Sequence, residues 1–207
     1  MADLVTVKDG KLIDSKVIDR IDSKIEKGVL GSVHALVVHQ TGAPTSDSAF
    51  NSYANGQNGA HFLIDKDGTI YQTARMNQKC WHVGKIRSKC QEMKSCAPDE
   101  LKAINAILFK KGESYSLRIA DLNTREAAKS YPERFPTNED SIGIEIVSAF
   151  DAKKETYDSV NKSQNDALAW LVGTLESVLG VGDDDVYAHG AIGYKQRSEG
   201  STAAWKR

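Results

Sequence analysis

Histidines occupy the places in this sequence that are best suited to chemistry. Four of the five lie at the ends of expected strands or in adjoining loops, where sites commonly form: His39, His61, His82 and His189. Glu199 follows His189 by ten positions, in a loop that contains glycine and serine. Two neutral imidazoles and one carboxylate are a normal ligand set for a catalytic zinc ion with an open fourth position. We therefore predict that His39, His189 and Glu199 bind zinc.

One carboxylate lies among isoleucines. Glu145 belongs to "SIGIEIVSAF" (141–150), a pattern that predicts a buried strand. A buried carboxylate is costly unless partners compensate it. A catalytic role is therefore favoured for Glu145, and a buried salt bridge is the alternative.

The elements that would position these residues alternate along the chain. Apolar spacing predicts a helix over 12–28, within a leading segment 1–32, and a helix over 163–179 that a capping pattern from Ser163 to Asp166 opens. The other expected elements are a strand at 34–41, a helix at 46–56, a hairpin at 60–74, helical pieces near 99–110 and 123–131, and a strand at 185–189. This order predicts an α/β fold with a mixed central β-sheet flanked by helices.

The length of 207 residues fits one domain, 1–207. Residues 85–140 differ from the rest because they are charge-rich and contain Pro132 and Pro136 close together. We expect them to form a helical and irregular insert between two strands that carry site residues.

Composition restricts the partners and the compartment. A net charge of −1 argues against nucleic acid, and no apolar run approaches the roughly 18 residues that a membrane span needs. The N-terminal sequence lacks the pattern of a Sec signal peptide, so we expect synthesis in the cytoplasm and export, if any, by another route. Cys90 and Cys96 are close enough to bridge in an oxidising compartment, and two free thiols are the alternative.

Five motifs in order resemble a known family. The series "LVVHQT", "AHFLIDKDGTIYQ", "CWHVG", "SIGIEIV" and "YAHGAIGYKQRSEG" is similar to the zinc-dependent N-acetylmuramoyl-L-alanine amidases of the type-2 amidase and peptidoglycan-recognition superfamily. The resemblance covers roughly 33–84 and 141–205. It implies that His39 and His189 are zinc ligands. Glu199 stands where the third ligand is usually Asp or, in some branches, Cys.

The resemblance also assigns catalytic roles. Glu145 matches the glutamate that acts on the attacking water in the bacterial branch. Arg197 stands where a lysine commonly stabilises the oxyanion, and it keeps the positive charge in a planar form. Lys195, two positions earlier, is a second candidate for that role.

Further residues are expected at the substrate. Trp81 and His82 match the "WH" of the wall beside the substrate, and His61 is a third candidate for substrate binding. The stretch between Gly84 and Ser141 is longer than is usual in the family, which suggests a lid or a partner-binding insert.

The resemblance implies a zinc amidase that cuts between N-acetylmuramic acid and L-alanine in peptidoglycan or muropeptides. The alternative is a non-catalytic peptidoglycan-binding module, which the carboxylate at position 199 disfavours. Three biological roles stay open: cytoplasmic recycling, a phage lysin, or a secreted antibacterial effector acting on the periplasmic wall of a target cell. The insert and a 90–96 disulfide would favour the effector, and an effector would imply a cognate immunity protein.

Overall fold

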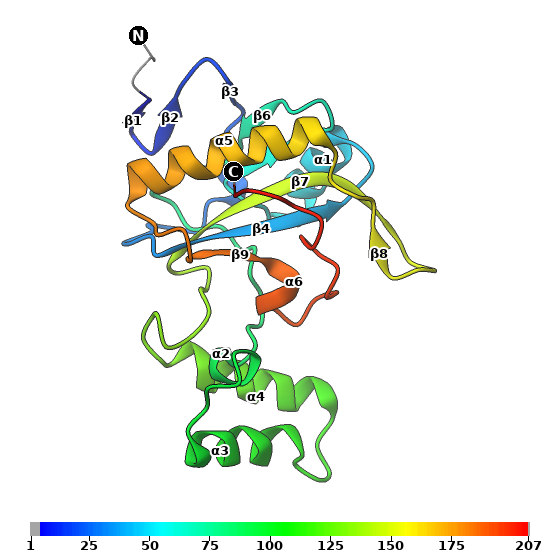
Figure 1. Cartoon of the computed structure of the whole chain (residues 1–207). Helices are drawn as coiled ribbons and strands as arrows, with labels where there is room; N and C mark the ends of the chain where they lie inside the picture. Colours follow the sequence, from blue (N-terminus) through cyan, green and yellow to red (C-terminus); the bar gives the residue numbers. More distant parts are fainter. Residues whose placement is uncertain (1–4, 207) are drawn as a thin grey trace.

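A mixed β-sheet forms the centre of the molecule in the computed structural model, which describes residues 5–206 (Figure 1). Six of its seven strands are hydrogen-bonded in the order β3-β6-β5-β7-β4-β9, and β8 pairs with the end of β7. Their bounds are β3 Val17–Asp19, β4 Ala35–Gly42, β5 Phe62–Ile64, β6 Ile70–Gln72, β7 Ser141–Asp151, β8 Thr156–Tyr157 and β9 Val186–Ala188. The antiparallel β5–β6 pair is the predicted hairpin, while β5, β7, β4 and β9 run parallel. The predicted fold class is confirmed.

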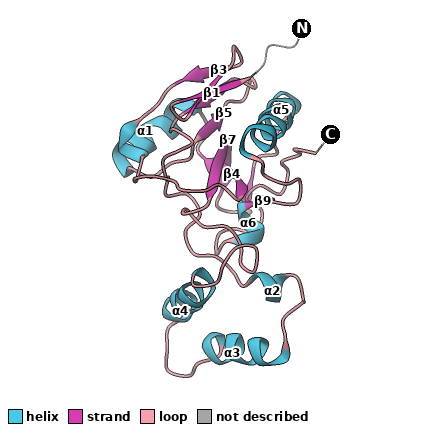
Figure 2. Cartoon of the chain, turned by 90° about the vertical axis from the view of Figure 1, so that its left-hand side faces the viewer, coloured by secondary structure: helices cyan, strands magenta, loops and turns pink. Residues whose placement is uncertain are grey.

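Helices cover the two faces of this sheet. Figure 2 shows α1 (Ser46–Gly56) on one side and α5 (Lys162–Leu179) on the other. The N-terminal cap of α5 is a capping box between Asn161 and Gln164, so the predicted pattern from Ser163 to Asp166 was wrong by two residues. Leucine and valine side chains on the buried side of α5 fill the main core with one face of the sheet: Leu168, Leu171, Val172 and Leu175.

Alternation along the strands separates the core from the site. Even-numbered side chains of β7, such as Ile144, pack in the main core with α5. Because successive side chains of a strand point to opposite faces, Glu145 lies on the other face. His39 is paired with Glu145 across the parallel β4–β7 ladder, so both side chains belong to the face that α5 does not cover. The isoleucines around Glu145 therefore bury the strand on one face while its other face carries the site.

The predicted helix over 12–28 was wrong. The leading segment 1–32 instead contains β1 (Thr6–Lys8), β2 (Lys11–Ile13), β3 and a short 3-10 helix, η1 (Ser23–Ile25). Residues 1–4 of this segment lie outside the described residues. The side chain of Gln72 accepts a hydrogen bond from Leu12 N at 2.9 Å and donates one to Gly10 O at 2.9 Å. These two bonds hold the β1–β2 hairpin against the sheet. β-branched Val17 and Ile18 suit a strand, and pairing with β6 outweighed the helical spacing.

The insert lies between β6 and β7 and extends away from the sheet (Figures 1 and 2). It contains α2 (Lys89–Glu92), α3 (Pro98–Leu108) and α4 (Tyr115–Ala127), so the second helical piece begins eight residues before its predicted start. Cys90 and Cys96 form a disulfide. Within the described residues, the helices are too short or too polar to cross a membrane.

Candidate metal and catalytic site

Three candidate ligand atoms converge at one point on the face of the sheet opposite α5. His39 Nδ1 lies 2.9 Å from His189 Nδ1 and 3.1 Å from Glu199 Oε1, and His189 Nδ1 lies 2.7 Å from the same oxygen. All three residues are buried. His39 lies inside β4, not at its end as expected, while His189 begins α6 (His189–Ile192) directly after β9. The predicted ligands are therefore brought together as a group that could hold a metal ion.

The outer nitrogen of each ligand histidine has its own partner. His189 Nε2 donates to Val83 O at 2.6 Å, and His39 Nε2 lies 3.0 Å from His82 Nδ1. Ser141 Oγ donates to Thr137 O at 2.6 Å and lies 3.4 Å from His82 Nε2. A proton on His82 Nε2 directed at Ser141 leaves Nδ1 to accept from His39. Both ligand rings, when neutral, then present an Nδ1 lone pair to the centre, as a metal requires.

The donor set fits a zinc ion. Two Nδ1 lone pairs and a carboxylate oxygen facing one another repel unless a cation or a proton lies between them. Tetrahedral zinc with bonds of about 2.0–2.1 Å holds its ligands about 3.3 Å apart, a few tenths of an ångström wider than the separations here. Small side-chain rotations provide that space, and three protein ligands leave the fourth position open.

Burial sets the protonation of these groups. Burial, reinforced by His189, lowers the pKa of His39 to about 4, so its ring is neutral at pH 7. Without an ion, a proton can instead lie on Nδ1; burial then opposes ionisation of Glu199, but hydrogen bonds from His189 and His39 outweigh it and lower the pKa of Glu199 to about 2. Burial, with the nearby charge of Glu199, raises the pKa of Glu145 to about 8. The pKa values of the two carboxyl groups therefore differ. Glu199 remains an anion at neutral pH, whereas Glu145 is able to take and return a proton.

Specific backbone contacts hold the loop that carries Glu199. Gly190 N donates to Glu199 O at 3.0 Å, and a Cβ at position 190 would lie 2.5 Å from Gln196 O, so only glycine allows the loop to fold over α6. Gly200 N donates to the side-chain oxygen of Gln40, on β4, at 2.8 Å. The loop is therefore tied to the strand that also carries His39.

A cleft of about 700 Å³ opens beside the three ligands. Glu145 lines it, is half-buried and has no hydrogen-bond partner for Oε2 among the described residues. Trp81 forms part of the rim and is 56% exposed, with Lys27 Nζ 5.1 Å from its ring centroid. The lining residues that the sequence analysis did not identify include four from α1, the end of the insert and the β7–β8 hairpin: Tyr53, Asn138, Phe150 and Tyr157.

The assignment of Arg197 to the oxyanion is not supported by its position. Its guanidinium donates to both carboxylate oxygens of Glu92, on α2, at 2.8 and 2.9 Å, and its side chain is 56% exposed. Lys195 instead lines the cleft, and its charge lowers the pKa values of Glu145 and His39. The positively charged side chain at the cleft is therefore Lys195, two positions before Arg197. Arg197 instead links the loop to the insert through Glu92.

The expectation that His61 binds substrate was wrong. His61 is fully buried; its Nε2 donates to Gln78 O at 2.8 Å and its Nδ1 accepts from Gly143 N at 3.0 Å. With both ring nitrogens used by the backbone, His61 is a structural residue between β5 and β7. His82 does line the cleft, but its ring also supports His39.

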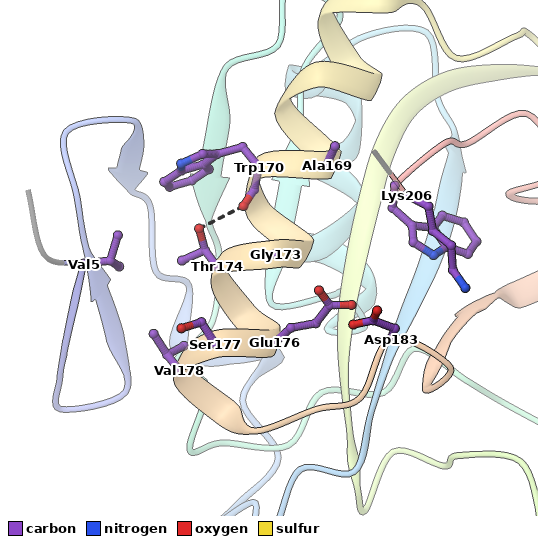
Figure 3. Close-up of a pocket in the computed structure, with 11 residues that line it drawn as sticks. Val5, Ala169, Trp170, Gly173, Thr174, Glu176, Ser177, Val178, Asp183 and Lys206 are labelled. Carbon is purple, nitrogen blue, oxygen red and sulfur yellow. Dashed lines mark hydrogen bonds between the residues drawn. The ribbon is translucent and has the colours of Figure 1, made fainter. Parts of the chain in front are cut away.

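A second groove, of about 670 Å³, runs along α5 beside the N-terminal hairpin (Figure 3). Trp170, Glu176 and Asp183 are among its lining residues, and none of the described residues that line it is a histidine or a cysteine. It takes no part in the candidate site.

The sequence profile of one family matches most of the chain. The profile described as N-acetylmuramoyl-L-alanine amidase matches residues 30–202, a range that includes all three candidate metal ligands and Glu145. The chain belongs to this family. It is accordingly an N-acetylmuramoyl-L-alanine amidase with a site that could hold a metal, and the resemblance seen in the motifs is confirmed.

Solved structures show the same fold at low identity. A selenomethionine derivative of AmpD is 19% identical, with 90% of this chain and 87% of that chain covered and a TM-score of 0.52. AmpDh3 from Pseudomonas aeruginosa, in complex with an anhydromuramic pentapeptide, is 19% identical with a TM-score of 0.50. That match covers 77% of this amidase but only 51% of AmpDh3. None of the curated proteins compared with the chain matches it.

Proposed function

We propose that this amidase uses zinc to hydrolyse the amide between N-acetylmuramic acid and L-alanine in peptidoglycan or its fragments. The observation that carries the proposal is the convergence of His39 Nδ1, His189 Nδ1 and Glu199 Oε1 beside Glu145. The Oε2 atom of Glu145 has no hydrogen-bond partner among the described residues. The muropeptide in the AmpDh3 complex supports this substrate class. A complete ligand set also favours an enzyme over a module that only binds peptidoglycan.

His39, His189 and Glu199 would hold the ion, which would supply Lewis-acid chemistry for the attacking water and the scissile carbonyl. Glu145 takes a proton from the attacking water as the water oxygen bonds to the carbonyl carbon. The same carboxyl returns the proton to the alanine nitrogen when the C–N bond breaks. Lys195 faces the negative charge that develops on the carbonyl oxygen. The products are the free lactyl carboxyl and the amine of the stem peptide.

The experiment is a product analysis with the purified chain, zinc and a soluble N-acetylmuramoyl peptide. We expect mass spectrometry to show release of the intact stem peptide with a free alanine amine. Binding of the muropeptide without cleavage, at full zinc occupancy, would instead favour the binding module.

We further propose that the amidase acts outside the cytoplasm, on the periplasmic wall of a target cell, as an antibacterial effector. The Cys90–Cys96 disulfide supports this role, because such bonds persist in oxidising compartments. An effector implies a cognate immunity protein in the producing cell. Expression of the chain with and without a periplasmic signal tests the proposal: lysis only with the signal supports it. Lysis that needs a holin-like partner would favour a phage lysin, and harmless periplasmic expression would favour recycling.

A further inference from the structure

The start of the insert is joined to the chain that follows α6, although about a hundred residues separate them. Arg87 N donates to Ile192 O at 2.7 Å, and Arg87 Nε donates to Gly193 O at 2.9 Å. The loop that continues from this junction carries both Lys195 and Glu199. The insert therefore borders the segment that supplies the third candidate metal ligand.

An ion pair ties the middle of this loop to the insert. The Arg197 guanidinium donates to both carboxylate oxygens of Glu92 at 2.8 and 2.9 Å. Arg87 Nη1 lies 3.9 Å from the same carboxylate, and Ser198 Oγ adds a hydrogen bond to Glu155 O at 3.0 Å. Exposed ion pairs usually contribute little, but a bidentate pair of arginine and carboxylate within a network of charges is the exception. The pair can therefore restrict where the loop lies.

The carboxylate side of this pair depends on a disulfide. Glu92 ends α2, a helix of four residues that are all at least partly exposed. Helices this short are unstable in isolation. The Cys90–Cys96 disulfide closes the turn around Glu92, and a cross-link removes alternative conformations of the chain between its two cysteines. Lys89 is a further tie, because its Nζ lies 3.3 Å from the hydroxyl of Tyr187 on β9. Oxidation of the two thiols therefore restricts where the Glu92 carboxylate can lie.

We propose that Glu92 is a positioning residue for the candidate metal site, and that the disulfide around it makes metal affinity depend on oxidation. Through Arg197, Glu92 keeps Glu199 near its place before the ion binds, so less conformational entropy is lost when the ligands close on the ion. In the oxidation, a sulfur–sulfur bond forms between Cys90 and Cys96 as two electrons and two protons pass to an external disulfide, which becomes two thiols. The inference rests on the proposed function, and it adds the insert to the parts of the chain that shape the site.

The zinc affinity of the oxidised, metal-free chain measures this positioning. Competition with a chromophoric chelator should show a zinc Kd raised on the order of 10-fold in Glu92→Ala, as for residues that orient metal ligands. Arg197→Ala should raise the Kd by a similar factor. The double variant Glu92→Ala/Arg197→Ala should raise it no further than either single change, because both remove one contact. The matched control is Glu100→Gln, which breaks an ion pair with Arg125 inside the insert and should leave the Kd unchanged.

A second variant isolates the part of the disulfide. Cys90→Ser/Cys96→Ser removes the cross-link without leaving thiols that bind zinc, so its zinc Kd should rise by a factor similar to that of Glu92→Ala. Amide hydrogen exchange over 195–200 in the metal-free protein should be faster in both variants, while kcat at saturating zinc stays within a few-fold of wild type.

The outcomes distinguish the inference from the proposed function. An unchanged zinc Kd in Glu92→Ala, or additive effects of Glu92→Ala and Arg197→Ala, would overturn the positioning role. An unchanged Kd in the serine variant would overturn the dependence on oxidation. A folded wild-type chain that binds no zinc, or that is inactive at full zinc occupancy, would overturn the proposed function instead.

Discussion

His39 and Glu145 are directly paired across the parallel strands β4 and β7. Their side chains therefore emerge on the same face of the sheet, which places the proposed base beside a proposed metal ligand. The register is fixed by the two central strands and by the isoleucine core on the opposite face. The proposed base and one proposed metal ligand thus come from the central strands, while Glu199 and Lys195 come from the loop that follows α6.

Glu145→Gln should abolish most turnover and leave the fold intact. Glutamine has nearly the same shape but cannot take a proton from water, so kcat should fall by 10²-fold or more, on the order of a general base's contribution. Zinc content should match wild type, and the variant should remain folded. A variant that unfolds while keeping its turnover per folded molecule would make Glu145 a structural residue.

The same variant should change how stability depends on pH in the metal-free protein. The pKa of Glu145 is raised from 4.5 to about 8 in the folded state. Between these values the unfolded chain releases a proton that the folded chain retains, so wild type loses stability as pH rises through this window. The free energy of unfolding of Glu145→Gln should therefore increase relative to wild type from about pH 4.5 to 8, then level off. Urea unfolding across this range measures it. The control Glu139→Gln, at an exposed ion pair with Lys79, should show little change, and a flat difference for Glu145→Gln would contradict the raised pKa.

Lys195 and Arg197 should differ in their effect on catalysis. Lys195→Ala removes the cation that lines the cleft, and kcat should fall by on the order of 10²-fold with zinc retained. Arg197→Ala breaks the pair with Glu92 outside the cleft and should leave kcat within a few-fold of wild type. Steady-state kinetics of the two variants decide the assignment; the reverse order of effects would restore Arg197 to the oxyanion.

The insert should matter for polymeric substrate. A variant that replaces α3 and α4 by a short linker keeps Asn138, whose side chain accepts hydrogen bonds from His82 N and Val83 N at 2.9 and 2.8 Å. It should fold and bind zinc, but lose more activity on intact sacculi than on small muropeptides, because exposed Phe109 and Leu117 are removed. Equal loss on both substrates would leave the insert without a role in substrate choice.

Sequence reasoning succeeded where a local pattern and the final packing agree. The isoleucines around Glu145 predict a strand with one buried face, and the hairpin at 60–74 has its own turn residues. The ligands His39, His189 and Glu199 follow from motif order. The leading segment failed because pairing of β3 with β6 depends on a partner about fifty residues away, which apolar spacing cannot reveal.

Side-chain direction in the loop could not be predicted. Lys195 and Arg197 are both cationic and two positions apart, and Glu92 of the insert is what draws Arg197 away from the cleft. The role of His61 was hidden in the same way, because its two backbone partners come from separate segments. Tyr53 has only one local signal, its place with Ala49 on the buried side of α1, and that signal indicates packing and not a site.

Zinc content of the His189→Ala variant tests the account most directly. Purified wild type and the control His34→Ala, at an exposed histidine outside the site, should each hold one zinc ion per chain by atomic absorption. His189→Ala should lose the ion and the amidase activity together, while circular dichroism shows that the sheet is retained. Full zinc occupancy in folded His189→Ala would contradict the account, because the ion would then be held by other residues.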